Sequence, residues 1–113
     1  MAAASRRLDV IEVLGNSMAP TLRPGDRLVV IRLDRLPRVG DVVLAGDPRD
    51  SSRELVKRVA AVGRDGVELR GDNPGASTDG RTFGPLPAPA IRWRVRFRYW
   101  PLARVGRAGN DGG

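Results

Sequence analysis

The chain contains a single lysine, Lys57, in the segment ELVKRVA. Lysine and arginine together number 20, so the other nineteen basic residues are arginines. A guanidinium stays charged in proteins, whereas a desolvated ammonium can lose its proton. The chemistry that separates Lys57 from the arginines is therefore that of a general base.

The neighbours of Lys57 favour this role. In an extended strand, Leu55, Lys57 and Val59 point to one side, while the charged neighbour Arg58 points away. Apolar surroundings disfavour the charged form of a lysine and lower its pKa. A base working near neutral pH needs a drop of roughly three units from about 10.4, worth about 4 kcal/mol. The alternative is a structural lysine whose ammonium reaches water from a half-buried strand.

A base needs a nucleophile, and Ser17 is the best candidate. The chain has no cysteine and no histidine, which excludes thiol nucleophiles, zinc fingers, disulfide frameworks and Ser-His-Asp triads. Ser17 lies in LGNSMAPTLRPGD, where Gly15 and Pro20 frame a sharp exit from a strand. A serine at such a turn is exposed, and its backbone N–H can bind a developing oxyanion. The alternative is an Asn-Ser turn without chemistry.

These residues must be positioned by a β-rich fold. A chain of 113 residues is one domain, and 14 Gly and 9 Pro with few aromatics indicate short strands and many turns. We expect a domain over residues 8–105 between flexible tails at 1–7 and 106–113. The patterns predict a hairpin return over 64–71 with its turn at Asp65-Gly66, a long loop over 71–89, and strands near 8–13, 27–32, 41–45, 51–63 and 91–99.

The last predicted strand, IRWRVRFRYW, alternates apolar residues with arginines. Alternation of this kind predicts one apolar and one cationic face. We favour a core strand whose cationic back faces solvent. The alternative is a basic strip that binds RNA or an acidic partner, although no aromatic side chain is left on that face to stack on bases. The cationic face consists of Arg92, Arg94, Arg96 and Arg98.

Charge and hydropathy bear on the location. The net charge of +7 attracts nucleic acid and anionic membranes without selecting either. Asp9 and Glu12 interrupt the apolar stretch that a signal peptide would need, and no segment approaches the ~20 apolar residues of a membrane span. We therefore expect a soluble, cytoplasmic protein that binds no nucleic acid, with peripheral membrane contact left open.

Taken together, the motifs resemble the signal peptidase family of Ser-Lys serine proteases. The segments GNSMAPTLRPGDRLVV, GDVVLA, LVKRVAAV and GDNPGASTDGRTFGPLP follow its conserved boxes in order, over about residues 10–99. Within the family, the short chain ending in RVRFRYWP is most similar to the maturation proteases of nickel-type superoxide dismutase. The resemblance implies a compact β-domain related to the LexA-type self-cleaving repressors.

The resemblance also implies roles for individual residues. Ser17 is the expected nucleophile and Lys57 the expected base. Ser77 matches a serine that hydrogen-bonds the lysine, Asp79 and Arg81 match a supporting ion pair, and Gly71, Asp72 and Asn73 match a loop that approaches the site. No cofactor is expected and no metal-ligand set is visible, so any nickel would belong to the substrate.

Departures from the family pattern refine this expectation. Some bacterial members have a hydroxyl residue two positions before the nucleophile to stabilise the oxyanion, but Gly15 stands there. The Ser17 N–H then needs a second donor, for which the Asn16 amide is a candidate. The short stretch from Lys57 to Gly71 leaves no room for the inserted second β-domain of larger members, and no membrane anchor is visible.

We therefore expect a soluble Ser-Lys endopeptidase that removes a leader from a precursor protein, with the nickel superoxide dismutase proprotein as the expected substrate. One alternative is a type I signal peptidase-like enzyme that cleaves secretory signal peptides. An alternative of another class is a non-catalytic basic β-domain that binds RNA or protein.

Overall fold

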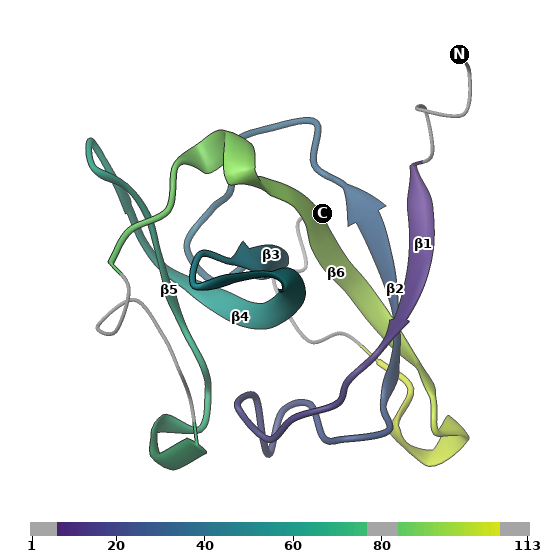
Figure 1. Ribbon diagram of the computed structural model, residues 1–113. Coiled ribbons are helices and arrows are strands. Elements are labelled where there is room, and N and C mark those ends of the chain that lie inside the picture. Colours follow the sequence, from purple (N-terminus) through teal and green to yellow (C-terminus); the bar gives the residue numbers. More distant parts are fainter. Residues whose placement is uncertain (1–6, 77–83, 107–113) are drawn as a thin grey trace.

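The computed structural model describes residues 7–76 and 84–106, which form one antiparallel sheet of six strands in the order β1-β2-β6-β3-β4-β5 (Figure 1). The strands are β1 (Leu8–Glu12), β2 (Arg27–Arg32), β3 (Val42–Asp47), β4 (Asp50–Gly63), β5 (Gly66–Arg70) and β6 (Ile91–Trp100). Three short 3-10 turns complete the described elements, namely η2 (Pro74–Ala76), η3 (Ala88–Ala90) and η4 (Leu102–Arg104). The prediction of an all-β domain is confirmed.

The hairpin from β4 to β5 is tight. Gly63 pairs with Gly66, so the turn consists of Arg64 and Asp65 and lies one residue before the predicted Asp65-Gly66. Gly66 instead begins β5 with φ at +121°, and a Cβ there would collide with the carbonyl oxygen of Leu86. The glycine is thus required by a close approach of two backbones. A two-residue connection also leaves no inserted second domain at this point.

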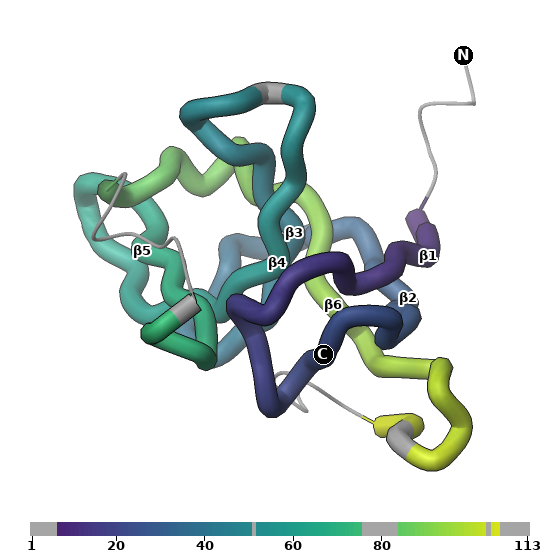
Figure 2. Tube along the Cα trace, turned by 60° about the horizontal axis from the view of Figure 1, so that its bottom comes forward, coloured from purple at the N-terminus to yellow at the C-terminus, as the bar shows by residue number. Residues whose placement is uncertain are grey.

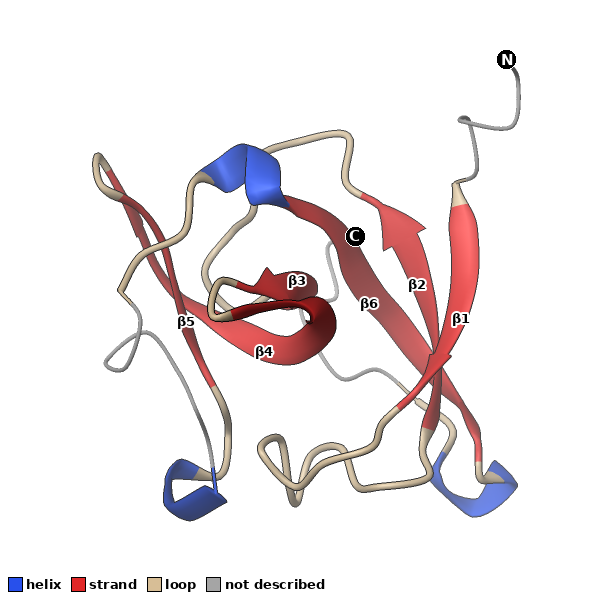
Figure 3. Cartoon of the chain, viewed as in Figure 1, coloured by secondary structure: helices blue, strands red, loops and turns tan. Residues whose placement is uncertain are grey.

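Strand β4 has two halves with different partners. Its first half pairs with β3, from Asp50 opposite Asp47 to Arg58 opposite Val42. Its second half, from Arg58 to Gly63, also pairs with β5. Residues 50–57 therefore pair with β3 along one edge. Along their opposite edge, no strand pairs with them within residues 7–76 and 84–106. Figure 3 shows β4 bending between these two parts of the sheet.

The core consists of two clusters of buried side chains. The second cluster joins β3 to β5 and the start of β6, while the first lies under β2, β3 and β6 and receives Met18 and Leu22 from the loop after β1. These two anchors hold that loop against the sheet, because removing either from the core would expose apolar area to water. The first cluster comprises Val13, Met18, Leu22, Leu28, Val30, Val42 and Val95, and the second comprises Val43, Ala45, Val59, Val67, Leu69, Leu86 and Ile91.

The expectation of a solvated cationic face on β6 is wrong for Arg94 and Arg98. Arg94 is only 6% exposed, and burial lowers the pKa of its guanidinium. Arg98 donates a 2.8 Å hydrogen bond to the carbonyl of Thr21. The physical reason is that β6 lies between β2 and β3, and register shifts on both sides break the simple alternation along the strand.

Candidate active site

Ser17 lies in a short turn at the mouth of the loop that follows β1. The Ala19 N–H donates to the Asn16 carbonyl at 3.1 Å, and the Leu22 N–H donates to the Met18 carbonyl at 2.9 Å. Asn16 is exposed and Ser17 half-buried, whereas Met18 is buried in the first core cluster. The buried Met18 and Leu22 fix on the core the turn that carries Ser17.

Lys57 lies in the first half of β4, opposite Val43 in the neighbouring strand. It is 2% exposed, and Leu55 and Val59 beside it on the same face are buried as well. The alternation predicted from the sequence is therefore confirmed, and the alternative of an ammonium reaching bulk water from a half-buried strand is wrong. Arg58 is turned to the other face, as the same pattern predicts.

Ser17 and Lys57 line one cleft of about 480 Å³. Its walls are the segment from the end of β1 to Met18 and the first half of β4, which come from distant parts of the sequence. Figure 2 shows the segment after β1 passing close to β4. Apolar side chains line much of the cleft. Glu12 and Glu54 also line it, and both residues are exposed. The expected nucleophile and the expected base therefore share one groove.

Asp72 ties the base strand to the nucleophile loop. Arg58, the neighbour of Lys57, donates from Nε and Nη2 to the two carboxylate oxygens of Asp72, both at 2.9 Å. The hydroxyl of Thr21 donates to the same carboxylate at 2.6 Å. The Arg58 hydrogen bonds hold the pKa of Asp72 below its usual value, burial opposes this, and Thr21 reinforces it. One carboxylate thus links β4 with the loop that carries Ser17.

Asn73 makes the next contacts with the same loop. Its backbone N–H donates to the Ser17 carbonyl at 2.8 Å, and its side-chain amide donates to the Asn16 carbonyl at 3.1 Å. The loop after β5 therefore lies directly against the turn that carries Ser17. The other expected supporting residues, Ser77, Asp79 and Arg81, lie outside the described residues.

The expected oxyanion donors are placed at the cleft. Asn16 and Ser17 both line it. The carbonyls of both residues accept hydrogen bonds from Asn73, which orients the peptide groups of the turn. Gly15 also lines the cleft, and a Cβ at this position would meet no atom within 4 Å.

Sequence reasoning missed the contributions of Thr21, Arg58 and Met18. The Asp72 N–H donates to the Met18 sulfur at 3.4 Å, so all three contact Asp72. Thr21 and Asp72 are 51 positions apart. No local pattern predicts a contact over such a separation, because it depends on how the two loops pack.

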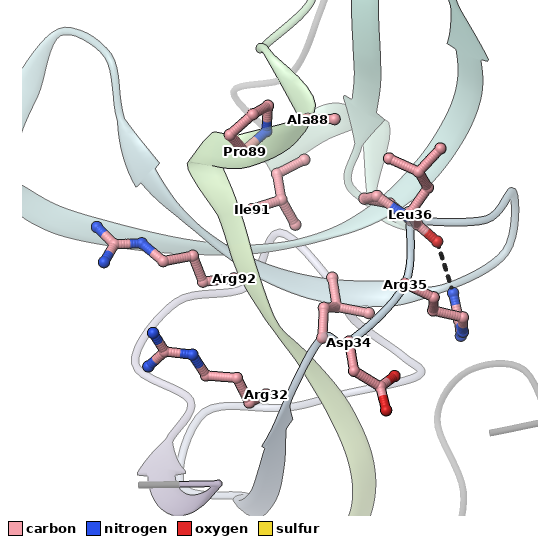
Figure 4. Close-up of a pocket in the computed structure, with 10 residues that line it drawn as sticks. Arg32, Asp34, Arg35, Leu36, Ala88, Pro89, Ile91 and Arg92 are labelled. Carbon is pink, nitrogen blue, oxygen red and sulfur yellow. Dashed lines mark hydrogen bonds between the residues drawn. The ribbon is translucent and has the colours of Figure 1, made fainter. Parts of the chain in front are cut away.

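A second hollow, of about 460 Å³, lies where β2 ends and β6 begins (Figure 4). Its walls come from the loop after β2 and from η3, and neither Ser17 nor Lys57 lines it. Arg35 is one of its lining residues and donates to the Leu36 carbonyl at 2.9 Å while pairing with Asp41. Arg32 and Arg92 extend in the same direction in Figure 4. This hollow has no group that fits the expected proteolysis.

The fold and the cleft define an all-β domain with a serine and a buried lysine facing one peptide-sized groove. Comparison with known proteins agrees with the family suggested by the sequence. Residues 2–73 match the model of the family described as signal peptidase, peptidase S26. The chain therefore belongs to this family.

Two relatives at the same level of similarity are membrane proteases. Human mitochondrial inner membrane protease subunit 1 is 33% identical over 121 residues, covering 86% of this chain and 72% of the relative. Mitochondrial ATP-independent inner membrane protease subunit 1a of Arabidopsis thaliana is 33% identical over 125 residues, covering 88% and 74%. Thylakoidal processing peptidase 1 of the same plant is 28% identical, with 79% and 41% covered.

These relatives correct two expectations. They are named as proteases of the mitochondrial inner membrane, which contradicts the expected cytoplasmic location. They are not named as maturation proteases of nickel superoxide dismutase, so the resemblance to that group gains no support. The alternative of a signal peptidase-like enzyme is better supported. In the part of the chain that the structure describes, no helix is long and apolar enough to cross a membrane.

Proposed function

We propose that this protein is a serine endopeptidase of the signal peptidase type, which removes an N-terminal presequence from a precursor protein. Ser17 is the nucleophile and Lys57 the general base. One observation carries the proposal: the half-buried serine of a well-anchored turn and the only lysine of the chain line the same cleft.

The proposed reaction uses both residues twice. Neutral Lys57 takes the proton from the Ser17 hydroxyl as Oγ attacks the scissile carbonyl carbon, and the resulting ammonium protonates the leaving amine as the C–N bond breaks. The acyl-enzyme ester is then hydrolysed by a water whose proton passes to Lys57 and back to Ser17. Burial of Lys57 among apolar side chains favours its neutral form, which the first step requires.

Substrate binding follows from the edge of β4 that faces away from β3. Residues 52–57 line the cleft, and the outer edge of this half of the strand has no strand partner within the described ranges. An extended peptide can add to such an edge through main-chain hydrogen bonds, while pockets accept its alternate side chains. This arrangement brings an extended segment of a precursor past Ser17.

We place the enzyme at a membrane, because its relatives are named as inner membrane proteases. A presequence of a membrane-targeted or exported precursor is therefore the proposed substrate. The nickel superoxide dismutase proprotein stays a second candidate that the motif resemblance alone suggests.

Co-expression with a precursor, followed by mass spectrometry of the product's N-terminus, tests this function. Two precursors are compared, one with a cleavable export presequence and one the nickel superoxide dismutase proprotein. We expect the wild-type protein to trim the first, and Ser17→Ala and Lys57→Arg each to leave it intact while the proteins remain folded by circular dichroism. Ser52→Ala is the matched control, because Ser52 also lines the cleft but lies in an exposed part of β4.

Three results would contradict the proposal in different ways. Full processing by Lys57→Arg would remove the general-base role of the lysine. If only the superoxide dismutase proprotein were trimmed, that proprotein and not an export precursor would be the substrate. Salt-sensitive RNA binding that survives Ser17→Ala, without processing of either precursor, would instead favour a non-catalytic basic domain.

A further inference from the structure

Two glutamates lie on the walls of the cleft that holds Ser17 and Lys57. Glu12 is the last residue of β1 and lies on one wall, and Glu54 belongs to the first half of β4 on the other wall. Both residues are exposed. The chain has only three glutamates and a net charge of +7, so two of the three lie at the cleft of an otherwise basic protein.

Neither of these carboxylates is compensated by a neighbouring arginine. Within the described residues, Glu12 and Glu54 form no ion pair and their side chains accept no hydrogen bond. Arg27 is the register partner of Glu12, but its Cζ lies 5.7 Å from the centre of the Trp100 ring. By contrast, the third glutamate of the chain lies on β5 and forms an ion pair at 2.7 Å. The two carboxylates at the cleft are therefore available to a ligand.

The basic residues that line the cleft do not cancel this negative charge. Lys57 is only 2% exposed, and the proposed reaction needs its neutral form. Arg53 also lines the cleft, but its Nη1 lies 3.9 Å from the carboxylate of the buried Asp47. With Lys57 neutral, two carboxylates stand against one guanidinium that already has an acidic neighbour. The lining of the cleft therefore favours a positively charged ligand.

Strand alternation places Glu54 beside a peptide that pairs with β4. Glu54 and Val56 lie on one face of this strand, while Leu55 and Lys57 lie on the other. In the proposed function, an extended peptide adds to the edge of residues 50–57 that faces away from β3. The peptide residue opposite Glu54 then has its side chain on the same face as the carboxylate. A strand rises about 3.3 Å per residue, so Glu54 lies roughly 10 Å, or three peptide residues, from Lys57 along the strand.

We propose that Glu54, assisted by Glu12 on the facing wall, makes the cleft select precursors with an arginine or lysine about three residues from the scissile bond. The inference rests on the proposed function, because the peptide must lie along β4. Opposite charges directly across two paired strands are stabilising, and like charges are destabilising. The cleft therefore accepts a basic segment of the precursor and rejects an acidic one.

Peptide binding by the Ser17→Ala protein tests this selection without cleavage. The probes are fluorescent alanine-based peptides in which each position in turn carries arginine, glutamine or glutamate, and fluorescence anisotropy gives the Kd of each. At one position we expect the arginine peptide to bind about fivefold more tightly than the glutamate peptide, with the glutamine peptide between them. Raising the salt concentration to about 1 M should reduce this ratio, because the carboxylate of Glu54 is exposed and salt screens it.

Charge reversal at single positions locates the selection. Glu54→Lys in the same protein should reverse the order, so that the glutamate peptide binds more tightly than the arginine peptide. Glu12→Lys should weaken the preference for arginine as well. Glu68→Lys is the matched control, since it changes the net charge equally but lies on β5 and does not line the cleft. It should leave the ratio of the two dissociation constants unchanged.

Three results would overturn the inference. One is that arginine and glutamate peptides bind equally at every position, or that none of the peptides binds. Another is a Glu54→Lys protein that still prefers arginine. The third is an equal change of the ratio in Glu68→Lys, which would make the net charge of the whole protein the cause. Because binding is measured apart from catalysis, a protein with Ser17 intact that prefers arginine peptides but cleaves none of them would contradict the proposed function alone.

Discussion

Arg58 and Asp72 form a bidentate ion pair, with Nε and Nη2 of the arginine each 2.9 Å from a carboxylate oxygen. The arginine belongs to the strand that carries Lys57, and the carboxylate also accepts from Thr21 in the loop that carries Ser17. The pair therefore connects the two parts of the candidate site. Both side chains are partly shielded from water, at 31% and 19% exposure, so the pair is more than a fully solvated contact.

Replacing Asp72 with Asn should lower the free energy of unfolding by about 2 kcal/mol at pH 7, because Arg58 loses its charged acceptor. The pKa of Asp72 is depressed in the folded protein. Its contribution is therefore present above the unfolded value of about 3.9 and is lost as the pH falls through the folded pKa. Urea unfolding of both proteins from pH 7 to pH 2.5 measures this. Curves that stay equally separated at low pH would contradict it.

Lys57→Met should abolish proteolysis without destabilising the fold. Methionine keeps a similar shape at this buried position and removes the polar amine that folding must desolvate, so the free energy of unfolding should be unchanged or higher. In the wild type, kcat/KM should rise with pH as Lys57 loses its proton, because only the neutral amine can accept the proton of Ser17. A flat pH–rate profile, or a lower free energy of unfolding for Lys57→Met than for the wild type, would contradict this assignment.

Gly66→Ala should destabilise the protein by about 2 kcal/mol or more, since a Cβ collides with a backbone oxygen in a positive-φ conformation. Gly63→Ala in the same hairpin is the control, because a Cβ there meets nothing within 4 Å. Thermal unfolding of the two variants measures the difference. Similar losses in both would mean that the approach of Leu86 to β5 is not as described.

Arg98→Met should lower kcat several-fold and should change KM by a smaller factor. The reason is that the loop carrying Ser17 loses the hydrogen bond that fixes the Thr21 carbonyl. Arg92→Met, at an exposed position of the same strand, is the control and should leave both parameters unchanged. Single-turnover cleavage of a presequence peptide separates the acylation rate from binding. If both substitutions had the same effect, the loss of one positive charge would explain it, and not a displacement of the loop that carries Ser17.

The fold class followed largely from local patterns. The span of β2 over 27–32 and the burial of Lys57 were predicted because strand alternation and turn chemistry act between near neighbours. On β6 the same rule was wrong for Arg94, since register shifts against both neighbouring strands are a property of the assembled sheet. The turn at Arg64 and Asp65 moved by one residue for a similar reason, the close approach of Leu86 to Gly66.

For the site, the sequence by itself determined which residue types are available: one lysine, no histidine, no cysteine, and a serine framed by glycine and proline. Only the tertiary structure decided that Ser17 and Lys57 line one cleft and that Asp72 holds their two segments together. Residue chemistry is a property of the single position and is read directly. Contacts between segments far apart in the chain depend on how the sheet curves and which edges stay unpaired, and no local pattern encodes them.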